Sequence, residues 1–241
     1  MLMEVSNLIS LIGKLLRVSF RLILGITGLK LLRLKCRTIE QFIDLAYSFR
    51  VGALDIRPLQ IREEIDQLLR IISILRPKTL VEIGTCNGGT LFLFCQVADP
   101  TATIVSIDLP GGPFGGGYPA WKIPLYKSFA RYPTQRIHLL RADSHNPNTL
   151  RKVREILTGK PLDFLFIDGD HTYEGVKRDF EMYSPLVRKG GVIAFHDIVE
   201  HPPETRCEVS MFWNEIKHGY KYLEIVKDWK QNWAGIGVIF V

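Results

Sequence analysis

Residues 79–90 read Thr-Leu-Val-Glu-Ile-Gly-Thr-Cys-Asn-Gly-Gly-Thr, and this stretch decides the fold. Four of its first five residues are apolar or β-branched and the run follows the breaker Pro77, which predicts a buried strand. Gly84 ends the strand, and Gly88 leads into a predicted helix over residues 90–98. Such a turn binds the polar end of a ligand, because glycines let backbone N–H groups approach closely and the helix dipole favours negative charge.

The residues of this turn indicate which class of ligand it binds. A dinucleotide site needs G-x-G-x-x-G, but Cys86 stands where the second glycine should be. Glu82 would repel a pyrophosphate and suits a cationic amino group. Asp108 follows Gly84 by 24 residues, at the end of a second apolar strand, where a carboxylate accepts hydrogen bonds from ribose hydroxyls. A nucleoside that carries an amino acid, S-adenosylmethionine, therefore fits better than NAD.

The series Glu82-x-Gly84-x-x-x-Gly88, followed by Asp108, resembles the first motif and the ribose-binding acid of class I S-adenosylmethionine-dependent methyltransferases. The resemblance spans roughly residues 60–241, from the helix predicted before the first strand to the end of the sequence. It implies a Rossmann-like α/β fold with a mostly parallel seven-stranded sheet, helices on both faces and a reversed last strand. It also implies that the turn and the second strand contact the cofactor through Glu82, Gly84, Thr85, Gly88 and Asp108.

The alternation of strands and helices independently predicts a doubly wound parallel sheet. The predicted strands are residues 79–83, 103–107, 136–140, 163–167, 191–195, 222–226 and 235–241. Besides the helix after the turn, the main predicted helices are residues 38–49, 60–75, 122–132, 172–184 and 206–218, and residues 51–59 read as an extended linker. We expect two regions, a basic helical arm at residues 1–50 and a cofactor-binding domain at residues 51–241.

Asp143 and Ser144 follow the third predicted strand of the sheet. In the family that the chain resembles, an acidic residue at this strand end reaches the exocyclic amine of the adenine, and Asp143 matches that position. The alternative is that Asp143 or Ser144 only caps the following turn, before a helix that begins near Pro147.

Carboxylates and imidazoles gather at the ends of the next two strands. Asp168, Asp170 and His171 follow one of them, and His196 and Asp197 end the other. Neighbouring parallel strands present their carboxyl ends to one place, where open α/β sheets bind ligands. Oxygen-rich groups with room for water suit a hard divalent cation such as Mg²⁺.

This pair of segments resembles metal-dependent O-methyltransferases of the catechol type, and more closely the cephalosporin-hydroxylase-type relatives. The resemblance implies that Asp168 binds both metal and cofactor, that His171 is the base, and that the pair His196–Asp197 completes the metal site. His171 replaces the family's lysine, which is reasonable because imidazole titrates near neutral pH. His196 stands where a carboxylate is usual, so Asp197 is the safer ligand and Asp170 could replace Asp168. The alternative is a metal-free site in which these residues orient the substrate.

The expected reaction is transfer of a methyl group from the sulfonium to a hydroxyl oxygen of a small molecule or glycan. Two other functions compete with it. One is a nicotinamide-dependent oxidoreductase, which the missing G-x-G-x-x-G disfavours. The other is a non-catalytic, accessory cofactor-binding protein that docks on a membrane or a partner.

The positive charge lies mostly in the arm. Residues 1–50 hold eight Lys/Arg and three acidic residues, whereas residues 51–241 hold 23 basic and 22 acidic residues. A nucleic-acid enzyme usually carries its positive field around the catalytic face, so we expect no nucleic-acid partner.

The first 35 residues are apolar but repeatedly interrupted by cations, including Lys14, Arg17 and Arg21 on one helical face. They contain no uncharged run long enough for a spanning helix, and their interrupted apolar core does not suit a signal peptide. This segment would either lie in a membrane interface or pack on the core or on a second subunit. The last alternative would make the protein a homo-oligomer.

The four cysteines show no disulfide or zinc spacing. We therefore expect the protein to be located in the cytoplasm, with or without membrane association.

Overall fold

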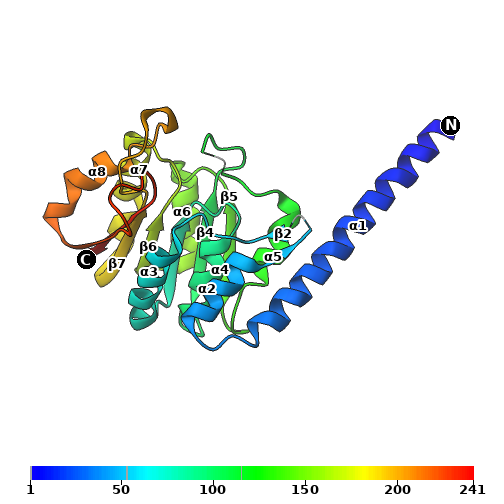
Figure 1. Ribbon diagram of the computed structural model, residues 1–241, viewed down its shortest axis with the longest axis horizontal. Helices are drawn as coiled ribbons and strands as arrows, with labels where there is room; N and C mark the ends of the chain where they lie inside the picture. The colour runs from blue at the N-terminus through cyan, green and yellow to red at the C-terminus, as the bar shows by residue number, and fades with distance from the viewer. Residues whose placement is uncertain (1, 53, 115) are drawn as a thin grey trace.

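The computed structural model describes residues 2–52, 54–114 and 116–241, and it gives the backbone alone for residues 2–17. The helices are α1 (Leu2–Arg33), α2 (Ile39–Ser48), α3 (Arg62–Leu75), α4 (Gly89–Val97), α5 (Ile123–Lys127), α6 (Pro147–Leu157), α7 (Tyr173–Tyr183) and α8 (Val209–Ile216). A short hairpin, β1 (Arg50–Val51) and β2 (Leu54–Asp55), separates α2 from α3. The remaining strands form one sheet at the centre of the molecule (Figure 1).

This sheet has seven strands in the order β5-β4-β3-β6-β7-β9-β8. β9 runs antiparallel to both of its neighbours, while the other pairs are parallel. The bounds are β3 (Thr79–Ile83), β4 (Thr103–Asp108), β5 (Arg136–Arg141), β6 (Leu162–Ile167), β7 (Val187–His196), β8 (Lys221–Ile225) and β9 (Ile236–Phe240). The Rossmann-like, doubly wound sheet with a reversed last strand is therefore confirmed.

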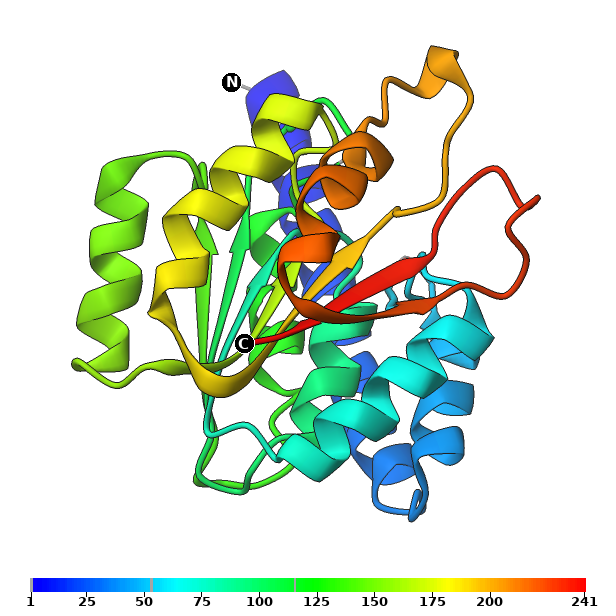
Figure 2. The same cartoon turned by 90° about the vertical axis from the view of Figure 1, so that its left-hand side faces the viewer.

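Each face of the sheet carries its own hydrophobic core, because successive side chains of a strand point to opposite faces. Leu80 packs with helices α2 to α5, whereas the next residue, Val81, packs with α6, α7 and α8. Figure 2 shows these two helical layers on either side of the sheet. Because the central parallel strands are covered on both faces, β3 is buried along its whole length and β6 is buried from Phe164 to Ile167.

Two local predictions were wrong. The helix expected over residues 122–132 ends at Lys127, and the following carbonyl groups bind side chains from other helices instead of continuing it. The oxygen of Phe129 accepts from Arg33 at 3.1 Å and from Gln96 at 3.0 Å. The segment expected as an extended linker contains the β1–β2 hairpin. The division into two regions at residue 50 stays a prediction, and α2, on the arm side, shares its core with α3 and α4.

The turn between β3 and α4 is fixed by contacts that tolerate only glycine. Gly84 has φ +92°, and a Cβ there would lie 1.9 Å from the backbone oxygen of Asp168 at the end of β6. A Cβ on Gly89 would lie 2.4 Å from the backbone nitrogen of Pro58. The glycines thus let the turn pack directly against the end of β6 and against the chain that follows β2.

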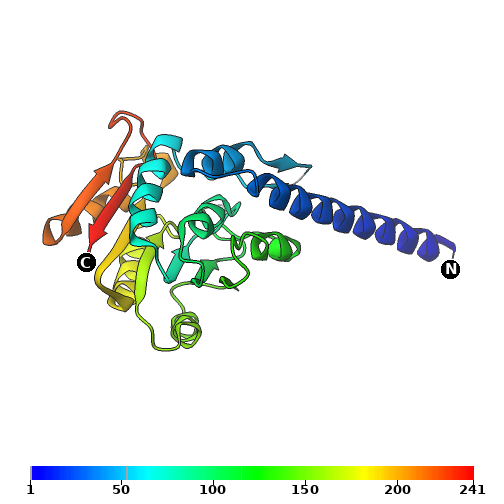
Figure 3. The ribbon, with the colours of Figure 1, turned by 90° about the horizontal axis from the view of Figure 1, so that it is seen from below.

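Helix α1 leaves the body of the molecule at an angle, and most of its length extends away from it (Figures 1 and 3). Its last turns are held in place, because Leu29 is buried and Arg33 donates to the backbone oxygens of Ser128 and Phe129 at 3.2 and 3.1 Å. Within the described part of the chain, no helix combines the length and the apolar character needed to cross a membrane.

We predict that Gly84→Ala destabilises the protein far more than Gly111→Ala. Both glycines have positive φ, +92° and +73°, but among the described residues no heavy atom lies within 4 Å of a Cβ added to Gly111. The Gly111 variant should lose about 1 kcal/mol of unfolding free energy, the cost of the left-handed backbone alone. The Gly84 variant should lose at least about 3 kcal/mol, because the backbone of two strands must separate. Urea denaturation measures both, and equal losses would contradict the proposed contact.

Candidate functional site

A cavity of about 790 Å³ lies over the carboxyl ends of β3, β4, β6 and β7. This is the place where the strand order reverses around β3, and open α/β sheets bind ligands there. Side chains from Tyr47 and from residues 57–60 form one wall, and the loop after β4 forms another through Leu109, Pro113 and Phe114. A cavity of this size accommodates a ligand the size of a nucleoside with an amino acid attached.

Most of the residues predicted to bind cofactor lie in the wall of this cavity: Gly84, Thr85, Asp108, Asp143, Ser144 and Asp168. The carboxylate of Asp108 accepts hydrogen bonds from the backbone N–H groups of Cys86 and Gly117, both at 3.0 Å. Burial raises the pKa of Asp108. Asp108 therefore joins the turn after β3 to the loop after β4 at the edge of the cavity.

Both predicted roles of Asp143 are compatible with its position. It lines the cavity, and its Oδ1 also accepts a hydrogen bond from the backbone N–H of His145 at 2.8 Å. The N-cap of α6 is Asn146, whose side chain binds the N–H of Asn148 at 2.9 Å. Asp143 thus shapes the turn without capping the helix, and its contact with an adenine stays a prediction.

Two residues predicted for cofactor binding lie outside the wall. Glu82 is fully buried beneath the turn, and its Oε2 accepts a hydrogen bond from Ser106 at 2.9 Å. Burial raises the pKa of Glu82 to about 8, so a direct contact with a cationic amino group does not follow from its position. Gly88 is the N-cap of α4 with φ +81°, and a Cβ there would meet the ring of Tyr126 at 2.9 Å. Its role in the structure is to let α4 begin against this ring.

The three residues predicted to bind metal do come together. Nδ1 of His196 lies 3.2 Å from Oδ1 of Asp168 and 3.2 Å from Oδ1 of Asp197. One ligand atom of each lies within 4.8 Å of the others, which a single cation could bridge. Nε2 of His196 is buried and has no hydrogen-bond partner among the described residues. Asp170, the alternative ligand, instead accepts from the backbone N–H and hydroxyl of Thr172 at 3.0 and 2.8 Å.

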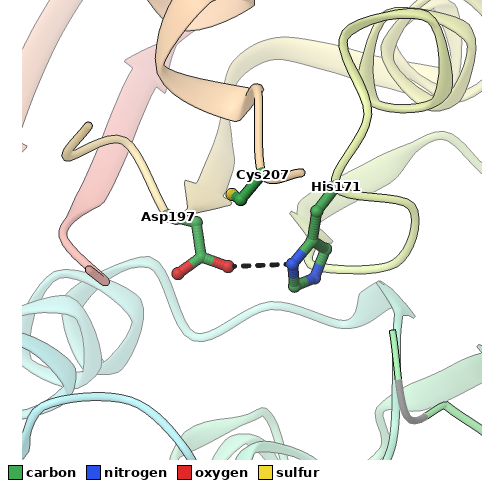
Figure 4. A group of neighbouring side chains, drawn as sticks. All are labelled: His171, Asp197 and Cys207. Carbon is green, nitrogen blue, oxygen red and sulfur yellow. Dashed lines mark ion pairs between the residues drawn. The ribbon is translucent and has the colours of Figure 1, made fainter. Parts of the chain in front are cut away.

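His171, the predicted base, lies beside these carboxylates in the cavity wall. Its Nδ1 is 3.2 Å from Oδ2 of Asp197, and its Nε2 is 3.6 Å from Oδ1 of Asp168. Figure 4 shows the Asp197–His171 ion pair, with Cys207 above it. Burial lowers the pKa of His171, but hydrogen bonds to Asp168 and Cys207 and the charges of both carboxylates outweigh it and raise the pKa to about 10.

We call Asp168, His171, His196 and Asp197 the Asp–His cluster. Two residues that the sequence analysis did not single out lie next to it. His201 lies with its Nε2 3.1 Å from Oδ1 of Asp197, and Cys207 is close to both His171 and Asp197. Asp197 has φ +63°, an uncommon backbone conformation for a residue other than glycine. The spacing Asp197-x-x-x-His201 was visible in the sequence, but the loop that returns Cys207 to the site was not.

Two further neighbours come from outside the predicted motifs. Gln60 donates from Nε2 to Oδ2 of Asp168 at 2.8 Å, and its own backbone oxygen accepts from the hydroxyl of Tyr47 at 2.5 Å. The ring of Phe114 stacks on that of His171, with centroids 4.9 Å apart and planes 14° apart. No sequence signal marks Gln60 as a site residue.

Comparisons with known proteins agree with this geometry. Residues 81–198 match the family model of a methyltransferase domain. An uncharacterized protein of Acanthamoeba polyphaga mimivirus is 36% identical over 153 residues, which cover 58% of this chain and 62% of that protein. An uncharacterized protein of Sinorhizobium fredii is 28% identical over 130 residues, 53% of this chain and 14% of that protein.

Among solved structures, the O-methyltransferase from Bacillus cereus, in complex with S-adenosylhomocysteine, has the same fold, with a TM-score of 0.57 and 17% identity. That alignment covers 86% of this chain and 93% of the other. The segment that matches the methyltransferase model, residues 81–198, runs from β3 to just beyond β7. It contains the glycine turn and the residues Asp168, His171, His196 and Asp197. The chain therefore matches the model of a methyltransferase domain over residues 81–198 and has the fold of an O-methyltransferase of known structure.

We predict that the stability of the Glu82→Gln variant increases relative to that of the parent protein as the pH rises. The pKa of Glu82 is about 8 in the folded protein, so the carboxyl group keeps its proton up to that pH, whereas the unfolded chain releases it near the ordinary pKa of 4.5. The unfolding free energy of the parent should fall relative to that of the variant by about 1.4 kcal/mol per pH unit between these two pKa values. Urea denaturation at several pH values measures this, and a pH-independent difference would contradict the buried, protonated carboxyl group.

Proposed function

We propose that this protein is an S-adenosylmethionine-dependent O-methyltransferase that acts on a hydroxyl group of a small molecule or glycan. The single observation that carries the proposal is one cavity that holds both the glycine turn of a methyltransferase domain and an imidazole between two carboxylates. The turn and the cluster are in direct contact, because the α-carbon of Gly84 packs against the carbonyl of Asp168. A methyl donor bound at the turn and an acceptor at His171 would therefore share one confined space.

The cofactor proposal rests on the walls of the cavity. Asp108 lies at the end of β4, where a carboxylate binds ribose hydroxyls, and Asp143 lies at the end of β5. The Bacillus cereus O-methyltransferase of the same fold was solved with S-adenosylhomocysteine, the product that remains after methyl transfer. This supports an adenosyl cofactor over a nicotinamide one.

The residues of the cluster fit a divalent cation such as Mg²⁺, with Asp168, Asp197 and His196 as its ligands. Asp197 offers a buried carboxylate and Asp168 a partly buried one, and both face Nδ1 of His196, although nitrogen is a less usual ligand for this ion. When bound, the cation would lower the pKa of the acceptor hydroxyl and offset the negative charge that surrounds His171.

His171 is proposed as the general base. Asp197 holds its Nδ1, which leaves Nε2, on the Asp168 side, as the atom that accepts the proton of the acceptor hydroxyl. The stacked ring of Phe114 covers one face of the imidazole and keeps water from it. Asp197 and Phe114 therefore orient His171, while Gln60 holds the other oxygen of Asp168.

The proposed partners are the cofactor and the acceptor, with no nucleic acid, and the proposed location is the cytoplasm. The balanced charge of residues 51–241 supports the first statement, and the absence of disulfide spacing in the sequence supports the second.

We predict that S-adenosylmethionine and S-adenosylhomocysteine each raise the thermal unfolding midpoint, whereas NAD does not. A ligand at about 100 times its dissociation constant adds roughly 2.7 kcal/mol of stability, which a thermal scan detects. A further rise with Mg²⁺ supports the metal site. A shift with NAD alone would overturn the proposal in favour of an oxidoreductase, and no shift with any of these ligands would remove the proposed cofactor.

We predict that His171→Ala lowers the rate of methyl transfer by about 10²–10⁴-fold, the usual contribution of a general base. Its affinity for S-adenosylmethionine should stay within a few-fold of the parent, because His171 lies on the acceptor side of the cavity. Transfer of a labelled methyl group to a panel of hydroxylated acceptors, with calorimetry for binding, measures the two effects. His218→Ala is the matched control, since His218 lies outside the cavity and should retain both properties. Unchanged turnover in the His171 variant would exclude it as the base.

A further inference from the structure

Helix α1 has two faces with different surroundings. In the C-terminal part of the helix, one face packs against the core through three side chains spaced three or four residues apart: Leu22, Ile26 and Leu29. The carbonyl contacts of Arg33 fix the same end. The rest of the helix leaves the body of the molecule (Figure 3).

The face opposite this contact carries large apolar side chains in the open. Phe20, Ile23, Leu24 and Leu31 share this face, and their exposed fractions are 63%, 62%, 49% and 58%. Large apolar groups gathered on one exposed helix face mark an interaction site more often than isolated ones do. The sequence continues the pattern towards the start of the helix, where leucine, isoleucine and valine remain frequent.

A narrow cationic stripe runs along the same helix. Lys14, Arg17 and Arg21 follow each other at intervals of three and four residues, so they share one face. Glu4 is the single acidic residue within residues 1–35. A mainly apolar helix with a stripe of cations and almost no acids matches the chemistry of an anionic lipid surface, where acyl chains take the apolar face and headgroups take the cations.

We propose that α1 binds peripherally to an anionic membrane surface and lies in its interface. The distribution of charge favours this partner over a second copy of the chain. Two α1 helices side by side would bring like charges together, because the stripe offers no acidic residues to pair with them. The proposed contact is along the surface, with the cations at the headgroups and the apolar face towards the acyl chains.

The direction of α1 is consistent with a role at a surface. Its free end lies on the same side of the molecule as the carboxyl ends of the parallel strands, where the cavity lies (Figures 1 and 2). A membrane that holds the outer part of the helix would therefore lie on the side of the molecule where the cavity is found.

The test is co-sedimentation of the full chain with vesicles of phosphatidylcholine that contain about one-third phosphatidylserine. The parent should bind these vesicles, lose most of the binding in pure phosphatidylcholine, and bind less as salt rises. The double variant Phe20→Ser and Ile23→Ser should bind at least about tenfold more weakly, since each side chain contributes apolar area. Ile74→Ser, on α3 and 86% exposed, is the matched control and should bind like the parent.

Three results would overturn the proposal: no binding by the parent, equal binding to neutral vesicles, or equal binding by the Phe20/Ile23 variant. Analytical ultracentrifugation without lipid gives a fourth, because a dimer that this variant dissociates would assign the face to a second copy. Far-ultraviolet circular dichroism shows whether the variant is folded. The cofactor-binding assay is independent of all these outcomes, since the exposed face of α1 lies outside the cavity.

Discussion

The contact between Gly84 and the backbone oxygen of Asp168 is the constraint on which the rest of the site depends. It brings the turn after β3 into contact with the end of β6, and the backbone N–H of Asp168 donates to the oxygen of Ile83 at 2.9 Å. These backbone atoms therefore fix the position of two parts of the cavity wall: the glycine turn, and Asp168 in the Asp–His cluster. Any side chain at Gly84 would separate the turn from the end of β6.

Burial of charge shapes the other half of the site. Burial favours the neutral form of a carboxyl group, yet the charges and hydrogen bonds of His196 and its neighbours keep the pKa values of Asp168 and Asp197 below their ordinary value. Removing one partner would leave the remaining charge buried and uncompensated, which is costly. The cluster is therefore a set of groups whose protonation states depend on one another, and a bound cation would change them together.

The sequence predicted the sheet and much of the site, because both follow from local patterns. Apolar runs marked the strands, and polar residues directly after them, such as Asp108, Asp168 and His171, had to reach the same edge. Glu82 is different because it lies inside the strand, one residue from its end, and points with Leu80 towards the α4 side of the sheet, so its contact with the cofactor stays a prediction. Gln60 and Cys207 could not be predicted, because long-range folding of irregular segments carries them to the cavity.

Gln60 also has a consequence for how such domains diverge. The matched methyltransferase segment begins at residue 81, but one wall of its cavity comes from the chain before it, through Tyr47 and residues 57–60. Substitutions in that preceding stretch would change the shape of the cavity while the glycine turn stays untouched. Transplanting the matched segment alone into another protein would carry the turn and the carboxylates without one wall of the cavity that they share.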